Sequence, residues 1–164
     1  MDPFPHTYRA RGAAQDTGDV ELSGDRLPAL HSASPAEFGG PGDRWSPETL
    51  LVGAIADCFI LTFRTIARAA SLPWTAVDCE VLGTLDRIDR VTQFVHFDVR
   101  ARLVVPDGTD VSQARAAMER AEHRCLISRS LKGRVHLETH VELQDARTIL
   151  TTCEPPVATT GTDR

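Results

Sequence analysis

One long apolar segment, residues 46–70, dominates the hydropathy pattern of the chain. Ser46 is a favourable N-cap residue, and Pro47 suits the first helical position because its missing N–H would be unpaired there. Glu48 adds negative charge in the first turn, where the helix dipole favours it. Apolar residues then point in nearly every direction around the predicted helix: Leu50, Leu51, Val52, Ala54, Ile55, Phe59, Ile60, Leu61, Phe63 and Ile66. Such a helix is buried in the middle of a core instead of lying on a surface.

Alternating apolar and polar residues predict strands on both sides of this helix. Short strands are expected at residues 7–11, 19–22 and 27–31, long strands at Val77–Arg87 and Thr92–Val105 with a turn at residues 88–91, and a last strand at Arg134–Leu143. In the second long strand, alternation places two sets of residues on opposite faces. One set is Phe94, His96, Asp98 and Arg100, and the other is Val95, Phe97, Val99 and Ala101.

Loop and helix signals complete the order of elements. Residues 34–43 hold three glycines and two prolines, which predicts a loop that leads into the long helix. A second helix is expected at Val111–His123, capped by Thr109 or Asp110. This order of elements is typical of an α+β fold. The length of 164 residues predicts a single domain at residues 7–143, with a flexible N-terminus (residues 1–6) and a polar C-terminal tail (residues 144–164).

Composition and charge narrow the classes of function. Hydrophobic residues make up 41% of the chain and charged residues 25%, as in ordinary soluble globular proteins. A net charge of −5 argues against a nucleic-acid partner, because no basic stripe is available to neutralise phosphates. The apolar stretch at residues 50–63 contains Asp57 and is expected to be too short to span a bilayer. The first residues lack the features of a signal peptide, so we expect a cytoplasmic protein with no membrane partner.

Neither the cysteines nor the histidines predict a metal site. The four cysteines, at positions 58, 79, 125 and 153, contain no CxxC pair, which is unfavourable for zinc. His136, Glu138 and His140 share one face of the last strand, but three ligands on one strand rarely converge on a single ion. We therefore expect neither a metal nor an organic cofactor.

Two cysteines are placed where they can carry chemistry. Cys58 lies in the middle of the long helix, where a free cysteine is either a small buried hydrophobic residue or a reactive thiol. Cys125 lies just past the second helix, and Cys153 falls in the predicted tail without an expected role. Structural disulfides are rare in the cytoplasm, so a disulfide in this chain would be transient and catalytic.

Three stretches resemble the OsmC/Ohr family of thiol-dependent hydroperoxide reductases. Residues 38–48 form a glycine-rich loop into a Pro-Glu helix start, residues 54–59 are an alanine-rich run ending in Cys-Phe, and residues 125–128 are similar to the family's second-cysteine motif. The second cysteine lies 67 positions after the first, and the order of elements matches over residues 7–143. The likeness is nearer to the OsmC-like branch than to the Ohr branch.

The resemblance implies an OsmC-like fold, with antiparallel sheets wrapped around long central helices in an intertwined homodimer. The pattern of residues 46–70 gives an independent reason for a partner. One chain of this length would not cover a helix that is apolar on nearly every side.

The resemblance also implies an activity, the reduction of organic hydroperoxides, with hydrogen peroxide as a second candidate substrate. The Cys58 thiolate would attack the peroxide and become a sulfenic acid, which Cys125 would resolve as a disulfide. An external dithiol, such as a lipoyl-type donor, would restore the two thiols. The alternative is two unrelated buried cysteines.

Glu48 resembles the glutamate that works with an arginine in the family's active site. It precedes Cys58 by ten residues, about 15 Å along one helix, so it would have to act on the partner's cysteine or through an arginine and a folded-back loop. The alternative is that Glu48 only complements the helix dipole.

The arginine is where this sequence departs from the family pattern. Better-known members carry it in a Gly-Gly-Arg turn after the first strand, whereas residues 12–18 here contain no arginine. Arg44 is the candidate replacement, or it pairs with Asp43 or Glu37 in solvent. This departure supports a second hypothesis, an OsmC-like stress-associated scaffold or small-molecule-binding protein without significant peroxidase activity.

Overall fold

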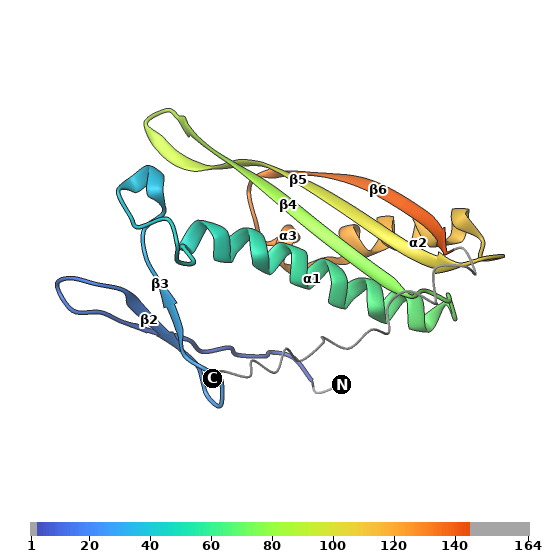
Figure 1. Cartoon of the computed structure of the whole chain (residues 1–164), viewed down its shortest axis with the longest axis horizontal. Helices are drawn as coiled ribbons and strands as arrows, with labels where there is room; N and C mark the ends of the chain where they lie inside the picture. Colours follow the sequence, from blue (N-terminus) through green and yellow to red (C-terminus); the bar gives the residue numbers. More distant parts are fainter. Residues whose placement is uncertain (1–2, 145–164) are drawn as a thin grey trace, which may run out of the picture. The chain divides into compact units, whose positions relative to one another are not determined.

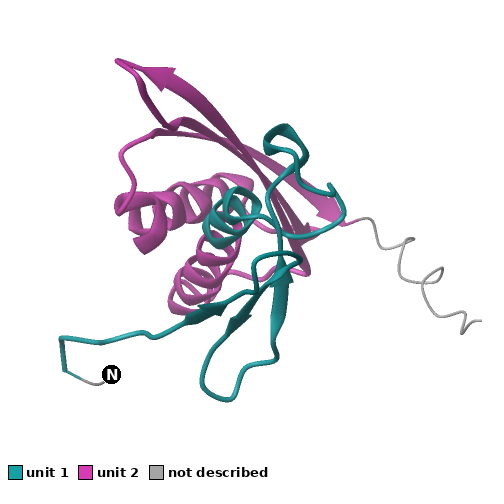
Figure 2. Ribbon diagram, turned by 90° about the vertical axis from the view of Figure 1, so that its left-hand side faces the viewer, with its two compact units in different colours: residues 1–55 teal, residues 56–164 magenta. Residues whose placement is uncertain are grey.

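The computed structural model describes residues 3–144, which divide into two compact units at Ile55, within helix α1 (Figure 2). Cys153, predicted to lie in the tail, falls outside the described residues. The α+β class predicted from the sequence is confirmed, because two three-stranded sheets and three α-helices make up the chain's described part.

The first unit contains an antiparallel sheet of short strands, β1 (Arg11–Ala13), β2 (Val20–Ser23) and β3 (Leu30–Ser32), in the order β1-β2-β3. Each strand begins one to four residues later than predicted. A 3-10 turn, η1 (Ala36–Phe38), forms inside the glycine-rich loop. Sequence alternation over three or four residues carries too little information to fix such boundaries.

Gly40 holds the glycine-rich loop closed. A Cβ atom added at this position would lie 1.6 Å from the Ser34 carbonyl oxygen, which is a backbone atom and cannot turn away. At the neighbouring Gly39, an added Cβ would meet nothing within 4 Å, although φ is 79°. The loop therefore tolerates a side chain at one of the two glycines far better than at the other.

We predict that Gly40→Ala lowers the free energy of unfolding by about 2 kcal/mol or more, because the loop has to open. Gly39→Ala should cost only about 1 kcal/mol, from its left-handed backbone alone. Urea unfolding of both variants checks the order. Equal losses would contradict the close approach at Gly40.

Helix α1 (Pro47–Ala69) forms where the sequence predicts it. The Ser46 hydroxyl accepts a hydrogen bond from the Thr49 N–H at 3.2 Å, and the Thr49 hydroxyl accepts one from the Ser46 N–H at 2.8 Å. This reciprocal pair satisfies two backbone donors at the helix start and confirms Ser46 as the N-cap. The helix ends where Ser71 takes a left-handed φ of 50° and the Leu72 N–H bonds to the Ala67 carbonyl.

One expectation about this helix is wrong. By length and composition α1 could cross a membrane, since its most apolar 18 residues have a mean hydropathy of 1.8. The expectation considered only the apolar stretch at residues 50–63, which is shorter than the helix itself. The core helix of a soluble protein passes the same test, so this finding alone assigns no membrane.

The second unit contains the long strands β4 (Ala76–Ile88), β5 (Val91–Pro106) and β6 (Arg134–Gln144), with helices α2 (Val111–Arg124) and α3 (Leu126–Arg129) between β5 and β6 (Figure 1). Strands β4 and β5 form an antiparallel hairpin. Its turn residues Asp89 and Arg90 both have positive φ, as in the two-residue turns that match strand twist. Asp110 caps α2 by accepting from the Ser112 and Gln113 N–H groups.

The expectation of purely antiparallel sheets is wrong, because β6 pairs with β5 in parallel. Helices α2 and α3 carry the chain back across the sheet between the two strands, so β6 starts from the same end as β5. Helix α3 is a single turn of four residues and was not predicted.

The inner face of this sheet forms the core of the second unit. Alternate residues of β5 are buried, namely Phe97, Val99, Ala101, Leu103 and Val105. Helix α2 packs on β5 and β6 through Ala114, Ala117, Met118 and Ala121. The common face predicted for Phe97, Val99 and Ala101 is thereby confirmed, and it is the buried one.

Phe94 departs from the predicted alternation. The register between β4 and β5 shifts between Thr84 and Leu85, so that Leu85 pairs with Phe94 and Val95 is an extra residue. The bulge lets the Phe94 ring stack on Phe97, with 5.3 Å between ring centroids, although the two were assigned to opposite faces. A single inserted residue reverses the faces on one side of it.

Candidate functional site

Cys58 is half-buried on α1, in the part of the helix that belongs to the second unit. Its Sγ atom lies 4.0 Å from the hydroxyl oxygen of Thr62, one helical turn further along. The start of α3 also lies near this sulfur. The backbone N–H groups of Leu126 and Ile127 and the thiol of Cys125 all face its sulfur.

These neighbours set the acidity of the Cys58 thiol. Burial acts to raise its pKa, as expected for a charge in apolar surroundings. The N–H of Ile127 and the thiol of Cys125 oppose burial, followed by the hydroxyl of Thr62 and the N–H of Leu126. Together these donors outweigh burial and hold the pKa of Cys58 below its ordinary value. A lowered pKa is characteristic of a nucleophilic cysteine.

Cys125 lies at the junction of two helices, as the last cap of α2 and the first cap of α3. Its side chain is fully buried. Burial raises the pKa of Cys125, and the adjacent Cys58 raises it further, while the hydroxyl and N–H of Ser128 act in the opposite direction. The structure thus brings the two predicted cysteines together as free thiols of unequal acidity.

Cys79 is a third thiol near this pair, and its sequence position predicted no role for it. It stands on β4 opposite Ala101, on the inward side of the sheet. Burial, the charge of Asp78 and the nearby Cys125 raise the pKa of Cys79 to about 12. Strand alternation could have placed it on the inner face, but no local signal could have shown that it lies near Cys125. Because its thiol stays protonated at neutral pH, Cys79 is not a competing nucleophile.

Arg44 is held by two carboxylates of the first unit. Its Nε lies 3.0 Å from Asp19 and its Nη1 lies 3.1 Å from Asp43. The hydrogen bond to Asp19 and the charge of Asp43 raise the pKa of Arg44 above its ordinary value. The pairing with Asp43 in solvent was one of the two alternatives from the sequence, and Asp19 was not foreseen.

Glu48 stands in the first turn of α1, where its acidic side chain was expected. Its Oε2 atom is buried and has no hydrogen-bond partner, and no ion pair joins Glu48 to an arginine within residues 3–144. A buried carboxylate oxygen without a donor is costly. The buried oxygen of Glu48 therefore lacks a hydrogen-bond donor in the described part of the single chain.

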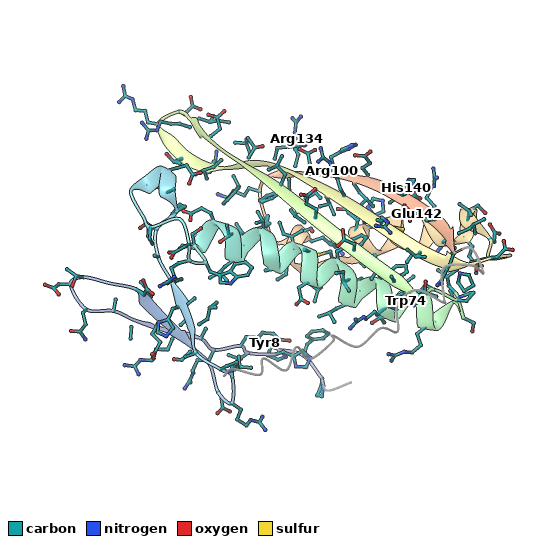
Figure 3. The ribbon with its side chains drawn as sticks, in the orientation of Figure 1. Tyr8, Trp74, Arg100, Arg134, His140 and Glu142 are labelled. Atoms are coloured by element: carbon teal, nitrogen blue, oxygen red, sulfur yellow. The ribbon has the colours of Figure 1, made fainter. Side chains whose placement is uncertain are left out.

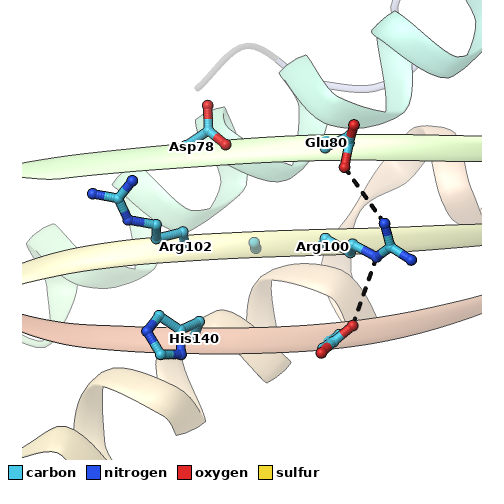
Figure 4. Close-up of a pocket in the computed structure, with 7 residues that line it drawn as sticks. Asp78, Glu80, Arg100, Arg102 and His140 are labelled. Carbon is cyan, nitrogen blue, oxygen red and sulfur yellow. Dashed lines mark ion pairs between the residues drawn. The ribbon is translucent and has the colours of Figure 1, made fainter.

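The outer face of the second sheet carries a row of charged residues, seen in Figure 3 around Arg100, Arg134, His140 and Glu142. Arg100 lies 3.7 Å from both Glu80 and Glu138 across the strands (Figure 4). These residues line an open groove of about 480 Å³, but all three are exposed and compensate one another. His140 pairs with Glu142 at 3.2 Å, so the histidine of this groove is also engaged by a carboxylate.

The pair of thiols, Cys58 and Cys125, is the arrangement in this chain that can carry out a reaction. A half-exposed cysteine of lowered pKa can attack an electrophile, and a second free thiol beside it can close a disulfide. Such a pair can cycle between a dithiol and a disulfide without a metal or an organic cofactor.

Comparisons with known proteins agree on one group. The family profile described as "OsmC-like protein" matches residues 40–140. The chain is 27% identical over 136 residues to the uncharacterized protein YmaD of Bacillus subtilis, covering 81% of this chain and 89% of that one. Its fold is similar to an OsmC-like protein of unknown function from Vibrio cholerae, with a TM-score of 0.75, 16% identity, and 82% and 99% of the two chains covered. It is also similar to an organic hydroperoxide resistance protein from Legionella pneumophila, with a TM-score of 0.67, 25% identity, and 85% and 99% covered.

Proposed function

The chain belongs to the OsmC-like protein family, and from this membership we propose that it is a thiol-dependent hydroperoxide reductase. The observation that carries the proposal is the Cys58 sulfur, which faces two backbone N–H groups, a hydroxyl and the Cys125 thiol. The resistance to organic hydroperoxides named for the relative from Legionella pneumophila supports a peroxide as the substrate.

The first step is nucleophilic attack on the peroxide. The Cys58 thiolate bonds to one peroxide oxygen, the O–O bond breaks, and the second oxygen leaves as an alkoxide that takes a proton from water. The sulfur loses two electrons and becomes a sulfenic acid, while the peroxide gains them and becomes an alcohol. Donors around the sulfur favour this step because they stabilise the thiolate.

The second step closes a disulfide. The Cys125 sulfur attacks the Cys58 sulfenic acid, and the hydroxyl group departs with the Cys125 proton as water. An external dithiol of the lipoyl type then exchanges with the disulfide, becomes oxidised itself and returns both thiols. The full burial of Cys125 favours its reaction with the adjacent Cys58 sulfenic acid over its reaction with peroxide in solution.

We also propose a homodimer. Only 28% of the most apolar 18 residues of α1 are buried in the single chain, and Leu61 is 50% exposed. A second copy that covers this helix would supply the missing burial. It would also bring donors to the unpartnered oxygen of Glu48.

We predict a dimer by size-exclusion chromatography with light scattering, and a shift toward monomer in Leu61→Asp, because the variant would bury a charge in an apolar interface. Wild-type protein that stays monomeric at tens of micromolar would contradict the proposed dimer. Circular dichroism of the variant separates dissociation from unfolding.

A second candidate function rests on Arg44 and Glu48. Arg44 is already engaged by Asp19 and Asp43, and Glu48 has no arginine partner in the described chain. This arrangement favours a stress-associated scaffold or small-molecule-binding protein with little peroxidase activity.

Peroxide consumption distinguishes the two candidates. Wild-type protein is mixed with dihydrolipoamide and with cumene, tert-butyl or hydrogen peroxide, and peroxide loss is compared with dithiol oxidation. Matched losses above the protein-free rate, greatest for the organic peroxides, support the reductase. Rates equal to the protein-free control for all three peroxides overturn it and leave the scaffold.

A further inference from the structure

We propose that Thr62 is a positioning residue, whose hydroxyl donates a hydrogen bond to the Cys58 thiolate and prepares it for attack. The proposal deepens the reductase function and rests on it for its catalytic meaning. Its geometric basis is the 4.0 Å contact between the Thr62 hydroxyl oxygen and Cys58 Sγ, made one helical turn apart on α1.

A second threonine on the same helix, Thr65, directs its hydroxyl differently from Thr62. A helical threonine ordinarily turns its hydroxyl back to the carbonyl four residues earlier. Thr65 does so and donates to the Leu61 carbonyl at 3.1 Å. The Thr62 hydroxyl instead lies against the side chain four residues earlier, and that side chain is Cys58.

The bond favours the thiolate over the thiol. A hydrogen bond to a charged acceptor is about twice as strong as one between neutral groups, so a hydroxyl beside the sulfur lowers the cost of removing its proton. Thr62 keeps its own proton throughout, and the alkoxide product is protonated by water. Thr62 acts through Cys58 and has no role as an acid or base.

Thr62 is also the donor that lies on the same helix as the nucleophile, so its position relative to Cys58 is fixed by α1. The N–H groups of Leu126 and Ile127 reach Cys58 from α3 and depend on how that turn is placed. Cys125 faces Cys58 from the same junction and is the titratable group beside its sulfur. Asp57, which precedes Cys58 on α1, is exposed. A test of Thr62 therefore has to be made both with and without the Cys125 thiol.

The test is the pH dependence of Cys58 alkylation, followed at the peptide level by mass spectrometry so that the other cysteines do not interfere. Thr62→Val should raise the midpoint by roughly half to one pH unit, a three- to tenfold loss of thiolate below the midpoint. Thr62→Ser should keep the wild-type midpoint, because it retains the hydroxyl. Thr65→Val, the matched control, should leave the midpoint unchanged.

The same series in a Cys125→Ser background removes the coupling between the two thiols and should give the same order of midpoints. An unchanged midpoint in folded Thr62→Val, or an equal shift in Thr65→Val, would overturn the role of Thr62. Alkylation needs no peroxide, so this result stands apart from the reductase proposal. If wild-type Cys58 is never oxidised by peroxide, the proposed function fails while the assignment of Thr62 is still decided by alkylation.

Discussion

Cys58→Ser should lower peroxide consumption about a thousandfold or more, to the rate of the dithiol alone. A serine hydroxyl remains protonated at neutral pH and cannot supply the polarizable anion that breaks the O–O bond. The donors of Leu126, Ile127 and Thr62 would remain in place without a nucleophile to stabilise. The measurement is peroxide loss against dihydrolipoamide oxidation at several pH values.

The pH profile of wild-type activity also tests whether the Cys58 thiolate is the nucleophile. Because the pKa of Cys58 is lowered, its thiolate persists below the pH at which an ordinary cysteine would be protonated. Activity should therefore fall with decreasing pH at a lower midpoint than an ordinary cysteine would give. A midpoint at or above that of an ordinary cysteine would contradict an activated Cys58.

Cys79→Ser is the matched control for the loss of a thiol. Its pKa of about 12 keeps Cys79 protonated and unreactive across the assay range. The variant should retain wild-type peroxide consumption. If it lost activity as completely as Cys58→Ser, the attacking thiol would have been assigned to the wrong cysteine.

The long helix could be predicted because its signals are local. Ser46 at the cap, Pro47 in the first turn and a largely apolar sequence to Ile66 all lie within the helix or next to it. The predicted and observed limits differ by a single residue at each end. The same holds for α2, where Asp110 marks the start.

Features that depend on distant residues could not be predicted in this way. The parallel pairing of β5 and β6 follows from the path of α2 and α3, which no alternation pattern records. The stacking of Phe94 on Phe97 follows from a register shift beside Thr84, on the neighbouring strand. Sequence alternation describes one strand at a time, whereas a bulge is a property of two.

The candidate site also combines features that could be predicted from the sequence with features that depend on distant residues. Spacing alone could not bring Cys58 to Cys125 across 67 residues, and the family resemblance supplied that pairing. The resemblance in turn could not foresee that Arg44 binds Asp19, because that contact belongs to this chain's own first unit. The role of Thr62 could not be predicted from the sequence, because a threonine hydroxyl inside an apolar helix ordinarily donates its hydrogen bond to a backbone carbonyl of the same helix.

Cys125→Ser should separate the two chemical steps. The first turnover should proceed at close to the wild-type rate, because the attack on peroxide uses Cys58 and its donors. The thiol of Cys125 is one of those donors, but the N–H of Ile127 has a larger effect and remains. Without a resolving thiol, the sulfenic acid persists and a second peroxide oxidises it further.

Intact mass spectrometry after one and after several equivalents of peroxide measures this outcome. The variant should trap with a sulfenic-acid reagent at first and then gain two oxygen atoms on Cys58, as sustained turnover falls at least tenfold. The wild type should instead form a disulfide between Cys58 and Cys125 that dihydrolipoamide reverses. Sustained turnover in Cys125→Ser at the wild-type rate would mean that the external dithiol reduces the sulfenic acid directly. The full burial of Cys125 would then be a matter of packing, and Cys58 would act alone.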